Sequence, residues 1–485
     1  MSDPSPSLVW FRSDLRLGDN PALTAAVARG APILPIFVLD DETPGRWRPG
    51  GASRWWLHHS LEALAQNLAR RGAPLILRRG DAHQQIRDVI AEGGAGAVFW
   101  NRRYEPSGIT QDRAVKADLK AQGLEVESFG ANLLHEPWTL RTKGGSPFRV
   151  FTPFWKAILE RGDPESPLPA PERLAAGPKL RSDSLDDWSL LPKAPDWSAG
   201  LRAAWAPGEV SGQARLRTFL DQNLLGYAEQ RNLPDRAQTS RLSPHLHWGE
   251  ISPRQVWQWT RDFVRDRADS RTEADAMAFL RELGWREFST HLLYHWPTLP
   301  ERAWRPAFEA IAWSEDETAY EAWCRGRTGF PIVDAGMREL WTTGWMHNRV
   351  RMVAASFLIK DLLISWQQGE AWFWDTLVDA DLANNAASWQ WVAGSGADAA
   401  PYFRVFNPVL QGEKFDPEGH YVRRWLPELA ALPDRFIHRP WEAPSALLAE
   451  AGVSLGTTYP HPLVDHGAAR KRSLAAYEQI KKQVA

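Results

Sequence analysis

The chain has 485 residues, which is too long for a single hydrophobic core and favours two or three domains. Its formal net charge of −2 excludes a protein that is basic overall, although a local basic face would still allow nucleic-acid binding. The single cysteine, Cys324, excludes a disulfide framework, a thiolate zinc site and an iron–sulfur cluster within one chain. We therefore expect no metal.

The N-terminus is short and polar, without the basic and then apolar plan of a signal peptide. No apolar run approaches the roughly 20 residues that a membrane span needs. We expect a cytoplasmic protein that does not enter a membrane. The chain has 27 tryptophans but only 8 tyrosines. So many indoles suit core packing, and also electron transfer between aromatic rings.

Residues 1–135 alternate between strand and helix patterns. Strands are predicted at 7–11, 32–39, 75–77, 97–100 and 125–129, and helices at 22–29, 53–71, 82–91 and 113–122. Continuous apolar runs such as 32–39 are typical of parallel strands buried on both faces. The pattern predicts an α/β domain with an open, doubly wound parallel sheet. No glycine-rich fingerprint follows the first strand, so we expect no dinucleotide there.

Residues 136–208 are expected to form a linker, because 162–208 is rich in proline, serine and aspartate and shows little periodicity. Strand patterns nearly vanish after residue 209. Helical spacing is found in 211–225, 253–266, 273–294, 333–341, 346–365 and 370–378. The sequence therefore predicts an all-helical domain over 209–485.

Two acids, two asparagines and two indoles crowd into residues 379–391, where apolar residues do not follow the helical period of 3.6. The segment is interpreted either as a loop that caps a core with its tryptophans, or as polar groups arranged around a planar cofactor. The residues concerned include Asp379, Asp381, Asn385, Trp389 and Trp391.

Trp285 and Arg286 follow Glu282 by three and four residues, so the three side chains share one helix face. Such a face is commonly a surface ion pair, but an indole on a charged stripe is unusual for a solvated face. Asn348, Arg351 and Met352 share a face by the same spacing. They suit a partly wet pocket, or else a helix start with a methionine in the core.

Residues 238–245 contain hydroxyl groups just before a predicted helix, which can cradle a phosphate or simply cap the helix. Several basic residues are interleaved with tryptophan and phenylalanine in the same half. They are compatible with a surface that follows a nucleic-acid backbone, or with an ordinary solvated face. These residues are Arg349, Arg351, Arg404, Lys414, Arg423 and Arg424.

Six motifs, in this order and at these spacings, resemble the DNA photolyase/cryptochrome family, and within it the bacterial cyclobutane pyrimidine dimer photolyases. They are residues 239–243, 282–287, 344–352, 379–385, 389–391 and 401–408. The resemblance covers nearly the whole chain and implies an antenna-type α/β domain, a long linker and a helical flavin domain.

The resemblance implies FAD as the cofactor. Arg351 and Asp379 match an ion pair that flanks the isoalloxazine, Asp381 an acceptor on its polar edge, and Asn385 the position that faces flavin N5. Arg286 matches a further flavin contact. The residues that match the phosphate side are Tyr227, Thr239, Ser240, Arg241, Leu242 and Ser243.

The resemblance also implies DNA containing pyrimidine dimers as the partner of a monomeric protein, associated with the nucleoid when bound. The pocket for a flipped dimer is matched by Glu282, Trp285, Asn348, Met352 and Trp391, and DNA contacts by Arg349, Arg404 and Gln411. Relatives that act on (6-4) photoproducts have a histidine pair in this pocket. Met352 stands at one of those places and favours cyclobutane dimers.

The family mechanism is light-driven electron transfer from excited, reduced FAD to the dimer, with return of the electron after both cyclobutane bonds break. Trp389, Trp366 and Trp313 match a relay that reduces oxidised flavin under light. The antenna chromophore is left open between methenyltetrahydrofolate, which is favoured, a deazaflavin and none. Residues 104–108 lack the Asn-Glu pair of some folate binders, and Arg103 replaces the acid of deazaflavin binders.

Three alternatives remain. A cryptochrome-type blue-light receptor would share the fold and FAD, but the dimer-pocket residues are complete and no long low-complexity tail follows the core. A light-independent flavin redox enzyme is disfavoured, because no nicotinamide fingerprint is found. A bare nucleic-acid-binding module would not need the residues at 379–391.

Overall fold

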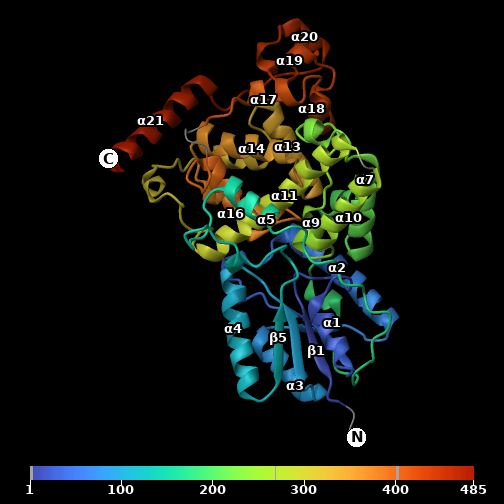
Figure 1. Ribbon diagram of the computed structural model, residues 1–485. Helices are drawn as coiled ribbons and strands as arrows, with labels where there is room; N and C mark the ends of the chain where they lie inside the picture. Colours follow the sequence, from blue (N-terminus) through green and yellow to red (C-terminus); the bar gives the residue numbers. More distant parts are fainter. Residues whose placement is uncertain (1–3, 268, 400–403, 485) are drawn as a thin grey trace.

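A computed structural model describes residues 4–267, 269–399 and 404–484. Its N-terminal α/β domain lies below a larger helical domain, and the last helices form the end farthest from the sheet (Figure 1). No helix among the described residues is long and apolar enough to cross a bilayer.

The α/β domain is built on a five-stranded parallel sheet with the order β3-β2-β1-β4-β5. The strands are β1 (Ser7–Phe11), β2 (Ile33–Leu39), β3 (Ile76–Arg79), β4 (Ala97–Asn101) and β5 (Glu125–Phe129). All pairs are parallel, and Val9 of β1 lies opposite Pro35 of β2 and Phe99 of β4. The chain reverses its direction across the sheet between β1 and β4, as in a doubly wound sheet. The predicted fold class and all five predicted strands are confirmed.

Helices cover both faces of this sheet. They are α1 (Pro21–Ala28), α2 (Gly51–Arg71), α3 (Ala82–Gly93) and α4 (Pro106–Ala121). Alternate residues of a strand point to opposite faces. Val9 and Phe99 accordingly belong to the core shared with α1 and α2, whereas Trp10 and Trp100 belong to the core shared with α3 and α4.

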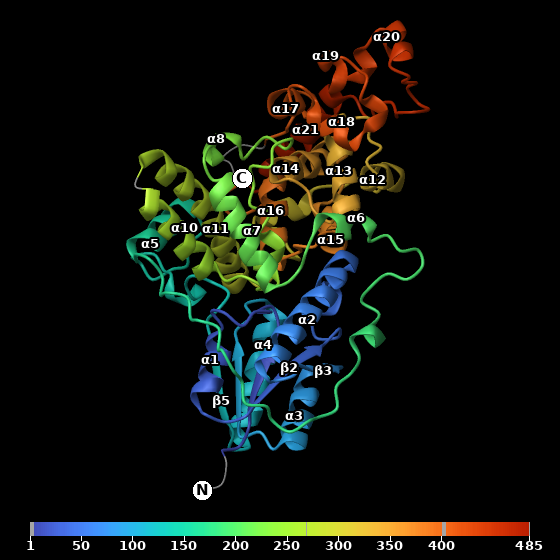
Figure 2. The same cartoon turned by 90° about the vertical axis from the view of Figure 1, so that its right-hand side faces the viewer.

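The connection between the domains wraps around the α/β domain (Figure 2). Leu174 N–H donates to the carbonyl of Arg71 and Asp183 N–H to that of Leu77, so backbone hydrogen bonds fix this segment to the sheet layer. The connection also contains α5 (Phe151–Glu160), η3 (Leu185–Trp188) and α6 (Ala199–Ala204). The sequence did not predict α5, whose apolar side packs on the helical domain.

The second half is helical throughout its described residues, as predicted. Its helices are α7 (Glu209–Gln222), α8 (Tyr227–Gln230), α9 (Ser243–His247), α10 (Pro253–Arg267), α11 (Ser270–His295), α12 (Glu317–Cys324), α13 (Pro331–Thr343), α14 (Asn348–Ser356), α15 (Trp366–Thr376), α16 (Leu382–Ala393), α17 (Pro408–Phe415), α18 (His420–Trp425), α19 (Asp434–Ile437), α20 (Ser445–Glu450) and α21 (His466–Val484). The single helix predicted over 346–365 divides, because α14 passes into a short π-helix, η5 (Phe357–Asp361).

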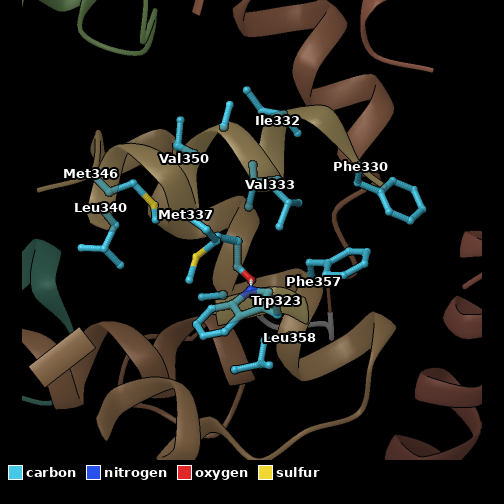
Figure 3. Packing of buried hydrophobic residues seen from close by; sticks show 14 of the residues in the cluster. Trp323, Phe330, Ile332, Val333, Met337, Leu340, Met346, Val350, Phe357 and Leu358 are labelled. Carbon is cyan, nitrogen blue, oxygen red and sulfur yellow. Dashed lines mark hydrogen bonds between the residues drawn. The ribbon is translucent and has the colours of Figure 1, made fainter. Parts of the chain in front are cut away.

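The core of the helical domain forms around Trp323, which is fully buried (Figure 3). Its indole Nε1 donates to the carbonyl of Ala354 at 3.0 Å, which satisfies its one polar atom inside an apolar cluster. Met337 and Val350 extend this cluster between α13 and α14. The same cluster contains Trp389, so the core reaches one wall of the site described below.

Residues 382–393 form helix α16, although their apolar residues lack a helical period. Asp381 caps the helix by accepting a hydrogen bond from Asn384 N at 2.8 Å, and Gly394 ends it in the left-handed conformation. The interpretation of this segment as a loop is wrong. The helix is buried on more than one side, and a helix of that kind shows no single apolar stripe.

The two domains meet through a buried polar interface. Arg16 follows β1 and donates to the carbonyls of Ala131 and Gly249, both at 2.8 Å. Glu250 in the helical domain accepts hydrogen bonds from Trp56 Nε1 on α2 and from Gly208 N. The backbones approach so closely that a Cβ at Gly249 would lie 2.1 Å from the carbonyl oxygen of Ser13. These contacts fix one domain against the other.

Candidate active site

A cavity of about 540 Å³ opens in the helical domain between α11, α14 and α16. The segment from α8 to α9 closes one end of it. Most residues predicted for the site line this cavity, although they are spread over 165 positions of the chain. They are Tyr227, Ser240, Leu242, Ser243, Glu282, Trp285, Arg286, Asn348, Arg349, Arg351, Met352, Asp379, Asp381, Asn385, Trp389 and Trp391.

Arg351 and Asp379 form the expected ion pair at the cavity wall, with Nη2 2.9 Å from Oδ2. A second bond from Arg351 Nε to the carbonyl of Met346, at 2.7 Å, holds the guanidinium in place. The Asp379 side chain is almost entirely buried, and the pair balances its charge. A fixed charge pair of this kind can position the polar rim of a planar ligand.

Asp381 also lines the cavity, two residues after Asp379, and its carboxylate is half-buried. Burial alone would raise its pKa, but the hydrogen bond and the charge of His247, together with Arg286 and the N–H of Asn384, lower the pKa of Asp381 to about 2. The Asn384 amide also donates to it at 2.7 Å. Asp381 is therefore an ionised acceptor at neutral pH.

Asn385 is a buried residue of α16, and a hydrogen bond to α15 fixes its side-chain amide. Its Nδ2 donates to the backbone carbonyl of Glu370 on α15 at 3.0 Å. The Glu370 carboxyl is completely buried, and neither of its oxygens has a hydrogen-bond partner among the described residues. Burial raises the pKa of Glu370 well above its usual range, which favours its protonated form. Sequence analysis did not find this residue.

The opposite wall comes from α11. Trp285 stacks on Phe151 of α5, with ring centroids 3.6 Å apart and an angle of 7° between the planes. Arg286 donates to the carbonyl of Asn132 at 2.7 Å, which ties the wall to the α/β domain. The shared face that the spacing predicted is confirmed, and it faces the cavity rather than solvent.

Glu282 pairs with Arg231, a cavity residue that follows α8 and that sequence analysis missed. Arg231 also lies over the Tyr227 ring, with Cζ 5.5 Å from the centroid. The carboxylate and the guanidinium together present both acceptor and donor groups to the cavity. Nearby, Arg349 donates to Asn232 Oδ1 at 2.8 Å.

The residues of the segment 239–243 differ in whether they line the cavity. Ser240, Leu242 and Ser243 line the cavity, as predicted for its phosphate side. Thr239 and Arg241 are not among the lining residues. Arg241 has a φ of 51°, and its guanidinium lies over the rings of Trp205 and Trp345, at 4.4 and 4.8 Å. Leu242, at the N-cap of α9, makes no side-chain capping bond, so the helix-cap interpretation is not supported.

Comparisons with known proteins agree with this geometry. The family model described as DNA photolyase matches residues 7–172, and the one described as the FAD binding domain of DNA photolyase matches residues 279–479. A deoxyribodipyrimidine photo-lyase from Agrobacterium fabrum is 53% identical over 480 residues, which cover 99% of this chain and 98% of the relative. The chain belongs to the DNA photolyase family. Cryptochrome-1 of Arabidopsis thaliana is 43% identical over 98% of this chain and 70% of its own length.

Among solved structures, a bacterial class III photolyase from Agrobacterium tumefaciens superposes on this photolyase-family chain with a TM-score of 0.96. The two are 52% identical, and the match covers 99% of each chain. The agreement extends over both domains and the linker. The family and the fold class predicted from the motifs are therefore confirmed.

The cavity fits the FAD that this family's domain binds. Its volume lies within the usual range for cofactor sites. It offers an ion pair and an ionised acceptor at one wall, indole rings at the others, and the hydroxyls of Ser240 and Ser243 at the end where phosphates would lie. Residues 227–243 precede the match to the FAD-binding model, so the cavity is completed from outside it.

Of the three tryptophans assigned to the photolyase relay, only Trp389 is a lining residue of the cavity. Trp366 is buried in the adjoining core, and Trp313 is half-buried against that core. Sequence analysis missed a further pair of tryptophans. The ring of Trp372 on α15 stacks on that of the exposed Trp341, with centroids 5.9 Å apart and an angle of 8° between the planes.

The residues predicted to contact DNA are less completely placed. Arg349 lines the cavity and stacks over Phe415, with Cζ 4.4 Å from the centroid. Arg404 is exposed just before α17, and Gln411 is half-buried within it. Residues 401–403 of the motif 401–408 lie outside the described residues.

A second cavity, of about 700 Å³, lies where the start of α2, η3 and α15 come together. Its walls contain three indoles and four guanidinium groups. They belong to Trp47, Trp188, Trp374, Arg46, Arg48, Arg54 and Arg79. Two carboxylates, of Asp41 and Asp375, also line it, and Asp41 pairs with Arg54 and Arg79. The indoles and the other two arginines suit a planar, anionic ligand.

The crevice at the carboxyl ends of β1 and β4, where open α/β sheets usually bind ligands, is instead filled by side chains. Arg12 pairs with Asp112, with Nη1 2.5 Å from Oδ1, and Asn101 Nδ2 donates to Asp14 Oδ2 at 2.6 Å. Arg103 donates to Gln111 at 2.7 Å. The loop 101–106 after β4 therefore contributes internal contacts.

Proposed function

We propose that the protein repairs cyclobutane pyrimidine dimers in DNA under blue or near-ultraviolet light, with reduced FAD as its cofactor. The observation that carries the proposal is the convergence of Glu282, Trp285, Asn348, Met352 and Trp391 on the cavity that contains the Arg351–Asp379 pair. The relative from Agrobacterium fabrum bears the name of this activity, which supports the proposal.

Bound FAD supplies a light-excited electron donor that also takes the electron back once the dimer has split. The chain's own residues position and stabilise the substrate. Trp285 and Trp391 offer aromatic walls that replace the stacking a flipped dinucleotide loses. Glu282 and Asn348 offer polar groups to the edges of the pyrimidines, and the adjoining Arg231 adds positive charge where negative charge develops.

Met352 favours cyclobutane dimers over (6-4) photoproducts. A thioether packs against a pair of saturated rings but can neither donate nor accept a catalytic proton. Repair of a (6-4) photoproduct needs acid–base chemistry, for which histidine is suited.

The direct test is repair of a thymine dimer in a short oligonucleotide by the reduced holoprotein, with and without blue light. Loss of the dimer only in the light would support the proposal. Tight FAD binding without repair in either condition would contradict it. That result would favour a cryptochrome-type receptor, a candidate supported by the 43% identity to cryptochrome-1 of Arabidopsis thaliana.

We also propose that the second cavity holds a folate-type antenna, methenyltetrahydrofolate, rather than a deazaflavin. A folate combines a planar pterin with carboxylates, which matches indoles such as Trp374 and guanidinium groups such as Arg48. The crevice filled by the Arg12–Asp112 pair offers less room for a deazaflavin.

Reconstitution with methenyltetrahydrofolate tests the antenna. We expect a new near-ultraviolet absorption band that is lost in Trp374→Ala and retained in Trp138→Ala, a control at another exposed indole. Binding of a deazaflavin alone, or of neither chromophore, would contradict the proposal. We further propose a cytoplasmic monomer that joins the nucleoid when bound to damaged DNA, and gel filtration checks the oligomeric state.

A further inference from the structure

Helix α2 presents a group of metal-ligating side chains that are not lining residues of either cavity. His58, His59 and Glu62 each offer one ligand atom, and these atoms lie within 4.8 Å of one another. Glu62 Oε1 lies 3.6 Å from His58 Nε2, and Glu62 Oε2 lies 2.8 Å from His59 Nδ1. Residues three and four positions apart face each other on a helix, so one carboxylate reaches both imidazoles.

Packing against neighbouring residues restricts the orientations of His58 and His59. His59 packs edge-on against Trp55, one turn earlier, with ring centroids 4.8 Å apart. His58 is only 4% exposed, so its ring cannot turn freely away from Glu62. An ordinary surface ion pair would instead leave both partners mobile in solvent.

The distances fit a hydrogen-bonded pair poorly at His58. Its Nε2 lies 3.6 Å from Glu62 Oε1, beyond hydrogen-bond distance, and its buried Nδ1 has no hydrogen-bond partner among the described residues. Imidazole nitrogens and a carboxylate are, however, ligands that divalent transition metals accept.

We propose that His58, His59 and Glu62 bind one late first-row divalent cation of the zinc, nickel and copper group. Metal–ligand bonds of about 2.0–2.1 Å in a tetrahedral site place ligand atoms about 3.3 Å apart. The separations of 2.8 and 3.6 Å observed here lie on either side of that value. The absence of further cysteines excludes only thiolate sites, so the site is compatible with the composition.

The fourth position would belong to water or to Asp186 on η3, a helix whose Leu185 and Trp188 pack in the same hydrophobic cluster as α2. The same short helix carries Trp188, a wall of the second cavity. A metal held by α2 and Asp186 would tie this part of the linker to the α/β domain. The ion would thereby stabilise the wall of that cavity without entering it.

Calorimetric titration of the full-length, tag-free, chelator-treated holoprotein with Zn²⁺ tests the site. We expect one high-affinity equivalent, which His59→Gln and Glu62→Gln each weaken by about tenfold or more. These two positions are more exposed than His58, so their variants are expected to fold, and retained FAD content verifies this. A Cu²⁺ titration followed by electron paramagnetic resonance should show two coupled nitrogens in the wild type and one in His59→Gln.

The matched control is His83→Gln. His83 also contacts a carboxylate, with Nε2 2.8 Å from Asp118 Oδ2, but no second histidine joins that pair. Its substitution should leave Zn²⁺ affinity unchanged, and Asp186→Asn should weaken affinity if that residue is the fourth ligand. Absence of binding in the micromolar range, or equal loss in His83→Gln and His59→Gln, would overturn the proposal.

Discussion

Arg231 and Glu282 form an ion pair across the mouth of the cavity, although 51 positions separate them in the chain. The pair joins the turn after α8 to the middle of α11. Its position indicates that the carboxylate is oriented before a substrate arrives, which avoids the cost of ordering it during repair.

Glu282→Gln should slow repair by about 100-fold, because a preorganised charged group at the reacting centre is lost. FAD content should stay near that of the wild type, since Glu282 lies on the substrate side of the cavity. Arg231→Gln should slow repair less, and the double variant should show that the two effects are not additive. Single-turnover repair under constant light measures all three; additive effects would mean that the pair does not act as a unit.

Met352→His should weaken dimer repair more than FAD retention, because it places a polar ring where a thioether packs against the substrate. Met352→Leu conserves volume and apolar character, so it should retain most activity. The two measurements are repair yield and flavin absorbance after gel filtration. Equal loss of both in Met352→His would show that the residue is only structural.

Trp389→Phe should abolish photoreduction of bound FAD, since this indole is the one relay tryptophan that lines the cavity. Trp366→Phe should slow it, and adding Trp372→Phe tests whether the stacked Trp372–Trp341 pair offers a second route. Trp138→Phe, at an exposed indole of η2 (Pro137–Thr139), is the control. Undiminished photoreduction in Trp389→Phe would remove this residue from the relay.

Glu287 should make stability depend on pH. Burial raises its pKa from 4.5 to about 8, although Arg286 and the N–H groups of Leu134 and His135 act in the opposite direction. The folded protein thus holds a proton that the unfolded chain releases between about pH 4.5 and 8, so the free energy of unfolding falls as pH rises through that window.

Glu287→Gln removes the titration but keeps an oxygen that can accept from Leu134 N. We expect its Tm to exceed that of the wild type at pH 8 and to lie near it at pH 5. Glu273→Gln, at an exposed acid of the same helix, should leave the pH profile unchanged. Parallel profiles for Glu287→Gln and the wild type would contradict the assignment.

DNA binding should weaken steeply with salt, because neutralised phosphates release counterions. Arg349→Gln should lower the slope of log affinity against log salt by about one, without changing the preference for damaged DNA. Arg87→Gln, at an exposed arginine of α3, is the control and should leave the slope unchanged. Fluorescence anisotropy over a salt series measures both, and a flat dependence in the wild type would contradict a basic DNA-binding face.

The parts of the site that could be predicted from sequence are those fixed by the local spacing of residues along the chain. Glu282, Trp285 and Arg286 share a face because of helix geometry, and the cavity then lies on that face. The apolar strands were predictable for a similar reason, since burial on both faces leaves continuous runs such as that of β2.

The missed residues depend on contacts between distant segments. Arg231 lies in a turn, and nothing near it in the chain indicates that it meets Glu282. Glu370 has the sequence context of an exposed helix position, and only the packing of α15 against α16 buries it. Helix α16 itself was misread because its several buried sides erase the period on which the prediction depended.

The buried interface formed by Arg16 and Glu250 has a consequence for light harvesting. Transfer of excitation between two chromophores falls steeply with distance and depends on the angle between their transition dipoles. The second cavity is lined from both domains, by α2 and by α15, and the first lies in the helical domain, so two chromophores in them would be held by domains that cannot rotate against each other. Their mutual orientation would be set once, when the chain folds, and the efficiency of transfer would be the same in every molecule rather than an average over orientations.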